Sequence, residues 1–180
     1  MTNKHFDFPF YDYELKLKDK PFLRQPYGKS WNELTWEEAG QMARKLATGL
    51  KSLGLKDKSH VGLISKNCKE WVIADLAIMM AGYVSVPFFP TLKSNEIKHL
   101  IEFGEVEALF IGKLEGNWDE MKKGIDTKNL PIISFPHYDG NSEVKEGHQW
   151  DDFINKFEPQ QENYYPKADD VWTIIFTSGT

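Results

Sequence analysis

Apolar residues recur along most of the chain in two patterns, one typical of amphipathic helices and one typical of buried strands. The clearest helix is predicted over residues 36–53. A capping box formed by Thr35 and Glu38 precedes it, and apolar positions then recur at steps of three and four residues. Gly54 follows, and glycine readily takes the left-handed conformation that ends a helix. This segment is therefore expected to lie with one apolar stripe against a core.

Short apolar runs without alternation follow, which is the pattern of strands buried on both faces of a parallel sheet. They cover residues 61–64, 83–86, 108–111, 131–135 and 171–176. We expect Pro87 and Pro90 to end the second run, because proline cannot donate to a sheet ladder. In the middle of the chain these strands begin about 24 residues apart, the length of a strand-helix-strand unit.

Helices are predicted between these strands. Asn67 is expected to be the N-cap of a helix that places Glu70 at its third position and continues to Gly82. Ser94 or Asn95 is expected to cap the next helix. Shorter helices are predicted over residues 118–125 and 150–157.

This alternation predicts the α/β fold class, with a mainly parallel sheet and flanking helices. The length of 180 residues is that of one domain or of part of a larger one. Residues 71–89 are apolar enough to suggest a membrane span, but Asp75, Ser85 and Pro87 interrupt them. We interpret that stretch as a buried helix that runs into a buried strand.

The composition excludes a disordered tail, since 41% of the residues are hydrophobic. The net charge of −5, without a run of five like charges, argues against a nucleic-acid partner. Cys68 is the single cysteine, which fits a reducing compartment, and we expect its thiol to be inert. The N-terminus has no apolar stretch before a cleavage site, so we expect a cytoplasmic protein. The cysteine and the five histidines show no metal-site spacing.

The last four residues are the best candidates for a binding function. Thr177, Ser178, Gly179 and Thr180 follow a predicted buried strand, at the edge where open α/β sheets bind ligands. Glycine allows the backbone to approach a phosphate closely, and hydroxyl groups add donors without bulk. When only these four residues are considered, an ordinary turn between a strand and a loop is the alternative interpretation.

This segment resembles the phosphate loop of the adenylate-forming superfamily of acyl-CoA synthetases, adenylation domains and luciferases. That loop reads approximately Thr-Ser-Gly-Thr-Thr-Gly-x-Pro-Lys-Gly, and its first four residues are present here. Residues 65–77 and 86–91 also resemble a long-chain fatty acyl-CoA synthetase pattern, Ser-x-Asn-Arg-x-Glu-Trp and then Val-Pro-x-Tyr-Pro-Thr. Cys68 replaces the arginine of that pattern and Phe89 replaces its tyrosine.

The resemblance implies an ATP-dependent ligase that forms an acyl-adenylate and then an acyl-CoA, with long-chain fatty acid as substrate. ATP, magnesium (Mg2+) and CoA are the implied cofactor and co-substrates. Thr177, Ser178, Gly179 and Thr180 would bind ATP phosphates, and no catalytic residue or metal ligand is assigned within this chain. Residues 1–180 would be the N-terminal portion of the large domain, truncated inside the phosphate-binding loop, with the magnesium ligands beyond residue 180. Such a piece is expected to be inactive alone.

Two alternatives stay open. The parent could be another acid–CoA ligase or an amino-acid adenylation domain, or the chain could be a non-enzymatic α/β interaction module. Association with the inner membrane face and self-association of the chain are also left open. In such a parent, the helix and strands that would pack over residues 171–176 come from later sequence. We therefore expect apolar surface to be exposed at residues 171–176 in this chain.

Overall fold

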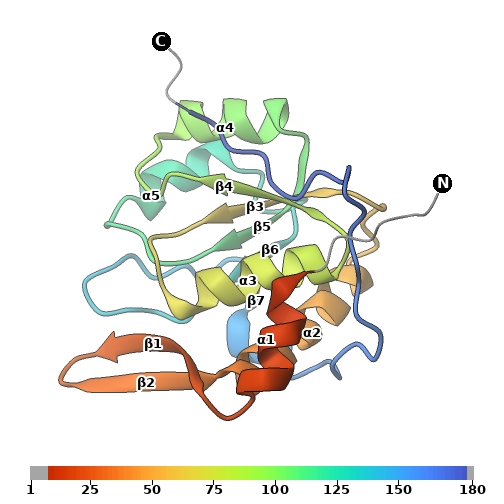
Figure 1. Ribbon diagram of the computed structural model, residues 1–180. Coiled ribbons are helices and arrows are strands. Elements are labelled where there is room, and N and C mark those ends of the chain that lie inside the picture. The colour runs from red at the N-terminus through yellow and green to blue at the C-terminus, as the bar shows by residue number, and fades with distance from the viewer. Residues whose placement is uncertain (1–7, 178–180) are drawn as a thin grey trace.

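The computed structural model describes residues 8–177, which form a parallel sheet with helices on both faces and a separate hairpin (Figure 1). The sheet contains five strands in the order β4-β3-β5-β6-β7, and every neighbouring pair is parallel. The strands are β3 His60–Ile64, β4 Val84–Phe88, β5 Val106–Ile111, β6 Ile132–Ser134 and β7 His148–Gln149. The predicted α/β class with a mainly parallel sheet is confirmed.

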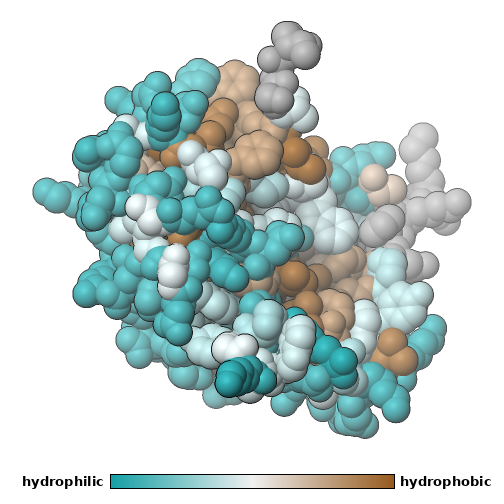
Figure 2. Space-filling model, turned by 90° about the vertical axis from the view of Figure 1, so that its left-hand side faces the viewer, coloured by the Kyte–Doolittle hydropathy of each residue, from teal (hydrophilic) through white to brown (hydrophobic). Residues whose placement is uncertain are grey.

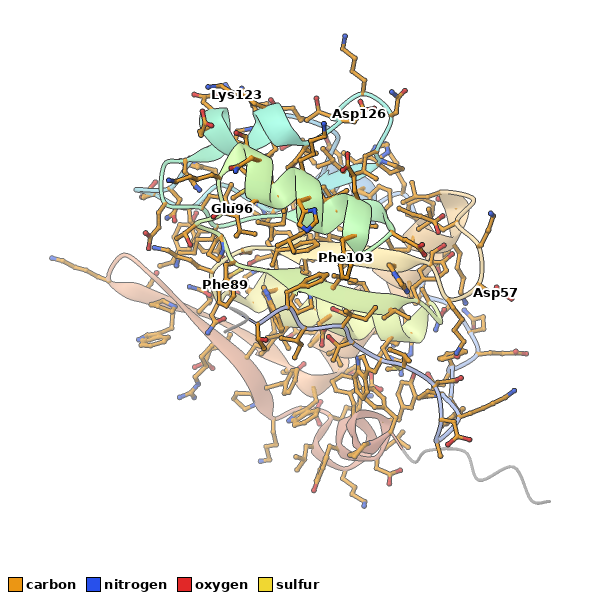
Figure 3. The ribbon with its side chains drawn as sticks, turned by 90° about the horizontal axis from the view of Figure 1, so that it is seen from above. Asp57, Phe89, Glu96, Phe103, Lys123 and Asp126 are labelled. Atoms are coloured by element: carbon orange, nitrogen blue, oxygen red, sulfur yellow. The ribbon has the colours of Figure 1, made fainter. Side chains whose placement is uncertain are left out.

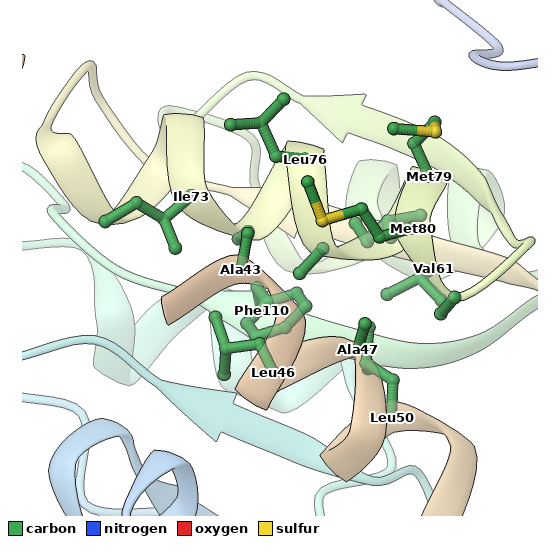
Figure 4. Packing of buried hydrophobic residues seen from close by; sticks show 14 of the residues in the cluster. Ala43, Leu46, Ala47, Leu50, Val61, Ile73, Leu76, Met79, Met80 and Phe110 are labelled. Carbon is green, nitrogen blue, oxygen red and sulfur yellow. The ribbon is translucent and has the colours of Figure 1, made fainter. Parts of the chain in front are cut away.

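The larger core lies on the face of the sheet covered by four helices. These are α1 Pro9–Leu17, α2 Trp36–Ser52, α3 Lys69–Met80 and α6 Trp150–Ile154. Leu46 and Leu50 of α2, Ile73 of α3 and Phe110 of the sheet belong to this core, and all four are fully buried (Figure 4). The opposite face carries the smaller core, under α4 Ser94–Phe103, α5 Trp118–Met121 and the 3-10 helix η1 Lys122–Gly124. The strand residues therefore fill two cores, which explains their unbroken apolar runs.

The predicted capping box of α2 is confirmed. The backbone N–H of Glu38 donates to Thr35 Oγ1 at 3.2 Å, and the backbone N–H of Thr35 donates to the Glu38 carboxylate at 2.8 Å. Both donors would otherwise lack a helical partner.

The N-terminal region contains a hairpin that the sequence did not predict. Strands β1 Pro21–Tyr27 and β2 Ser30–Thr35 are antiparallel and form a two-stranded sheet of their own. Gly28 is the first of the two turn residues and has φ of +58°, which favours glycine. Most residues of both strands are exposed, so the hydrophobic pattern that indicates a strand is missing.

The start of α3 differs from the prediction. Its N-cap is Cys68 rather than Asn67, and the Cys68 side chain makes no capping hydrogen bond with the described residues. Glu70 does not close a capping box, because its carboxylate accepts a hydrogen bond from the Tyr138 hydroxyl and forms an ion pair with Lys69. A partner distant in sequence has displaced the local one.

The predicted cap of α4 is also wrong by one or two residues. The helix begins at Ser94, so Lys93 occupies the N-cap position. The backbone N–H of Lys93 donates to Glu96 at 2.7 Å, while the Ser94 hydroxyl donates to Glu120 of α5 at 2.8 Å. Ser94 therefore joins two helices instead of capping one.

Two predicted helices are shorter than expected. The α-helix at residues 118–125 ends at Met121 and continues as η1, and the helix at residues 150–157 ends at Ile154. Strand β6 likewise covers only the middle of residues 131–135.

Strand β4 continues through Pro87, which the sequence analysis expected to end it. Ser85 directs its backbone N–H and C=O away from β3, since they bond with Trp172 and Ile174. Residues two apart in a strand point their amides to the same side, so the missing N–H of Pro87 also lies on this outer side. No bond to β3 is lost.

Residues 171–176 do not form the predicted strand. Thr173 makes one isolated parallel bridge with Ser85. The segment is also not buried on both faces: Val171 is 59% exposed and Ile175 is 66% exposed. Within residues 8–177 no strand pairs with its outer side. The exposed apolar surface predicted here is confirmed, and Figure 2 shows apolar side chains gathered beside the C-terminal end.

Among the helices of the described residues, none is both long and apolar enough to span a bilayer.

Candidate functional site

The carboxyl ends of the parallel strands meet at one edge of the sheet. Strands β3, β4, β5 and β6 end there at Ile64, Phe88, Ile111 and Ser134. Loops that leave this edge are the usual ligand-binding elements of open α/β sheets. The candidate site is therefore expected along this edge.

The C-terminal segment reaches this edge along the outer side of β4 (Figures 1 and 3). The Ser85 N–H donates to Trp172 O at 2.9 Å, and the Ile174 N–H donates to Ser85 O at 2.9 Å. Because this pairing is parallel, the segment runs in the direction of β4 and carries Thr177 toward the carboxyl edge.

Aromatic contacts hold the end of this segment. The ring of Phe176 stacks on Phe88, with centroids 5.8 Å apart, and lies 6.0 Å from the ring of Phe103. Gly104 leaves room for this arrangement, since a Cβ atom there would lie 3.3 Å from the Phe176 ring and 2.9 Å from Leu100 O. The sequence offered no signal for these contacts, because they join residues far apart in the chain.

Thr177 is exposed immediately after this aromatic anchor. The other three predicted phosphate-binding residues, Ser178, Gly179 and Thr180, lie outside the described residues. Their role stays a prediction.

A second group of polar residues lies where β3 and β5 end. Ser65 Oγ accepts a hydrogen bond from the Lys113 N–H at 2.9 Å and lies 3.7 Å from Cys68 Sγ. Burial, and next the nearby Glu70 carboxylate, raise the pKa of the Cys68 thiol to about 11. Such a thiol is almost entirely protonated at neutral pH, which agrees with the inert cysteine that we expected.

Glu70 is 1% exposed and is held from two sides. The Tyr138 hydroxyl donates to its carboxylate at 2.5 Å, and Lys69 Nζ lies 2.7 Å from it. Burial and the acceptor Glu70 raise the pKa of Tyr138, so the phenol stays a donor. The group ties α3 to the loop after β6 and has a structural role.

Asp75 lies on α3, in a stretch that is otherwise mostly apolar. It is partly buried, and this burial raises the pKa of its carboxyl group. Within residues 8–177, no group of three or more histidine, cysteine, aspartate or glutamate side chains is placed to hold a metal ion.

The parallel sheet, the loops at its carboxyl edge and the terminal segment beside β4 define an α/β ligand-binding domain. The chain belongs to the AMP-binding enzyme family, whose family model matches residues 13–180.

Several relatives with curated descriptions are long-chain acyl-CoA synthetases. The chain is 32% identical over 156 residues to Long chain acyl-CoA synthetase 5 of Arabidopsis thaliana, covering 81% of this chain and 23% of that protein. It is 26% identical over 175 residues to a long-chain fatty acid–CoA ligase of Mus musculus, covering 89% of this chain and 25% of that protein. The chain thus spans about a quarter of the length of these relatives.

Solved structures show the same fold at lower identity. The anthranilate CoA ligase AuaEII, in complex with anthranoyl-AMP, superposes with a TM-score of 0.78 at 18% identity, over 94% of this chain and 31% of that chain. Coronafacic acid ligase from Pectobacterium brasiliense gives a TM-score of 0.74 at 20% identity, over 93% of this chain and 32% of that chain.

Proposed function

We propose that this chain is the N-terminal portion of the large domain of an ATP-dependent long-chain fatty acid–CoA ligase. Family membership and the acyl-CoA synthetase relatives support this proposal. The observation that supports it most directly is the terminal segment, which runs parallel to β4 and carries Thr177 toward the carboxyl edge of the sheet.

The proposed reaction has two steps. A carboxylate oxygen of the fatty acid attacks the α-phosphorus of ATP, and the bond to pyrophosphate breaks to leave an acyl-adenylate. The CoA thiol then attacks the acyl carbon, loses its proton and displaces AMP. Magnesium would neutralise charge on the phosphates during the first step.

In this reaction the chain contributes binding and positioning. Thr177, Ser178, Gly179 and Thr180 would hold the phosphates of ATP through backbone N–H and hydroxyl donors, while Phe88 and Phe176 fix the segment that precedes them. We assign no catalytic residue and no magnesium ligand within residues 1–180. The chain alone is therefore proposed to be inactive.

The test compares the 180-residue chain with the longer polypeptide that contains it. Acid-dependent exchange of pyrophosphate into ATP should occur with palmitate for the longer polypeptide and be absent for the chain alone. Acetate, benzoate and amino acids should support exchange poorly. Preference for one of them would favour another acid–CoA ligase or an amino-acid adenylation enzyme, and exchange with none would contradict the proposal.

A pair of matched variants tests the phosphate loop in the longer polypeptide. Thr177→Val should reduce exchange about tenfold or more, since a charge-assisted hydrogen bond to phosphate is lost. Thr127→Val, which changes a threonine in the loop after η1, should leave exchange unchanged. Equal activity of the two variants would remove Thr177 from the site.

A further inference from the structure

The terminal segment needs more than its backbone contact to have a fixed position along β4. Ser85 makes both hydrogen bonds of that contact, one with Trp172 and one with Ile174. Parallel pairing repeats every two residues, so a segment that slipped by two residues would form an equivalent pair of bonds. Such a slip would move Thr177 by about 6.6 Å, which is two rises of a parallel strand. Other contacts are therefore needed to set the register.

Phe176 supplies one of these contacts, at the carboxyl end of β4. Its ring stacks on Phe88, the last residue of that strand, and lies close to the ring of Phe103. A contact at one end of the segment leaves the residues before it free to slip or bulge. The amino end of the segment needs an attachment of its own.

The residue that precedes the segment, Asp170, is held by two side chains and one backbone group. Lys58 Nζ lies 2.9 Å from Asp170 Oδ2 and donates to the Tyr164 hydroxyl oxygen at 3.0 Å. The Tyr164 hydroxyl donates to Asp170 Oδ2 at 3.3 Å, and the Lys167 backbone N–H donates to the same oxygen at 2.8 Å. Three donors thus converge on one carboxylate oxygen. We call Lys58, Tyr164 and Asp170 the Asp170 clamp.

The clamp is attached to the amino edge of the sheet. Lys58 lies in the turn before β3, and the carbonyl of the next residue, Ser59, accepts a hydrogen bond from the N–H of Val84 at 3.0 Å. Val84 is the first residue of β4. Gly82 leaves room for the Tyr164 ring, since a Cβ atom there would lie 3.2 Å from it. The clamp therefore joins Asp170 to the part of the sheet where β3 and β4 begin.

We propose that Lys58 is a positioning residue for the phosphate loop. The Asp170 clamp holds the amino end of residues 171–176 and Phe176 holds the carboxyl end, so the segment cannot slip along β4. Thr177 then reaches one defined place at the carboxyl edge. Lys58 lies at the amino edge, so it acts on the loop through Asp170. This inference rests on the proposed function, in which Thr177 and the residues after it bind ATP phosphates.

The first experiment measures hydrogen exchange of the Ser85 and Ile174 amides in the 180-residue chain by NMR. Lys58→Gln should speed this exchange about fivefold, because a charged hydrogen bond to a partly exposed carboxylate is lost. Lys58→Arg keeps the charge and should keep most of the protection. Lys56→Gln changes an exposed lysine in the same stretch before β3 and should leave the exchange unchanged.

The second experiment measures pyrophosphate exchange by the longer polypeptide that contains the chain. Lys58→Gln should raise the KM for ATP about fivefold and leave the KM for palmitate unchanged, because the displaced element is the phosphate loop. A purely structural loss would lower the melting temperature without separating the two constants. Tyr164→Phe removes the hydroxyl but keeps the ring and the contact of Lys58 with Asp170, so it should give a smaller change in the same direction.

The proposal is overturned if Lys58→Gln and Lys56→Gln give the same hydrogen exchange, or if Lys58→Gln changes the KM values for ATP and palmitate by the same factor. If Lys58→Gln does not fold, Tyr164→Phe takes its place in both experiments. A wild-type polypeptide without pyrophosphate exchange would contradict the proposed function instead. The hydrogen-exchange measurement does not depend on activity, so the two failures are distinguishable.

Discussion

The rings of Phe88 and Phe176 are stacked with their planes 8° from parallel. One residue ends β4 and the other precedes the proposed phosphate loop, so this contact connects the loop to the sheet. The backbone adds one bridge to β4, whose two hydrogen bonds both involve Ser85.

Phe176→Ala is therefore expected to loosen the C-terminal segment. Loss of an aromatic pair costs about 1 kcal/mol, which corresponds to about fivefold faster amide exchange at residues 173–177. Hydrogen exchange followed by mass spectrometry checks this. Phe89→Ala, which changes an exposed ring that makes no stacking contact with Phe176, should leave the exchange unchanged.

The buried ion pair of Glu14 and Arg44 gives a second prediction. The guanidinium donates two hydrogen bonds of 2.6 Å to the carboxylate, and both side chains are only 11% exposed. Glu14→Ala should lower the free energy of unfolding by about 3–5 kcal/mol, because it leaves a buried charge unpaired. Urea denaturation measures this change.

An exposed pair in the same chain supplies the control. Glu33→Ala breaks the contact of Glu33 with Arg24, whose side chain is 61% exposed, and should cost at most about 1 kcal/mol. If Glu14→Ala and Glu33→Ala lowered the free energy of unfolding by similar amounts, burial would not explain the strength of the Glu14–Arg44 pair.

The thiol of Cys68 should react slowly in the native protein. With a pKa of about 11, about one thiol in a thousand is ionised at pH 8. Iodoacetamide labelling should therefore be slow under native conditions and fast in urea. Rapid labelling of the folded chain at pH 8 would show that the thiol is neither buried nor protonated.

Asp75 should make stability depend on pH in an unusual direction. Burial raises the pKa of Asp75, so the folded state favours the protonated acid. The stabilisation is complete below the ordinary pKa of aspartic acid and is lost as the pH rises through the raised value. Asp75→Asn should thus increase the melting temperature at pH 7 relative to the wild type, with a smaller difference at pH 3.

Asp126→Asn is the matched comparison, and it should change the melting temperature at pH 7 in the opposite direction. Hydrogen bonding from Asn129 lowers the pKa of Asp126, whose carboxylate accepts from Asn129 Nδ2 at 2.8 Å. The variant should reduce the melting temperature at pH 7 and have little effect at low pH. The same sign for both variants would contradict the burial of Asp75.

The exposed side chain of Ile175 tests self-association. Because it is 66% exposed, Ile175→Lys should leave the fold intact and reduce association of the chain. Sedimentation velocity over a hundredfold concentration range measures this. A wild-type chain that stays monomeric throughout, without binding a hydrophobic dye, would contradict the prediction.

The elements that could be predicted from the sequence are those that depend on short-range interactions. The capping box at Thr35 and Glu38 joins residues three apart, and the apolar stripe of α2 follows from helical periodicity alone. The unbroken apolar runs similarly predicted strands covered on both faces, and the order of helices and strands predicted a parallel sheet.

Features in which a distant partner replaces a local one could not be predicted from the sequence, because they depend on which elements pack together. Glu70 was expected to close a cap at Asn67, but Tyr138, 68 positions away, binds its carboxylate and the helix begins later. Residues 171–176 carry the apolar pattern of a buried strand, yet burial needs elements on both sides. Within the described chain only the β4 side is covered, so the segment forms one bridge and exposes Ile175. An apolar segment tends to be buried, but whether it is buried depends on which other elements pack against it.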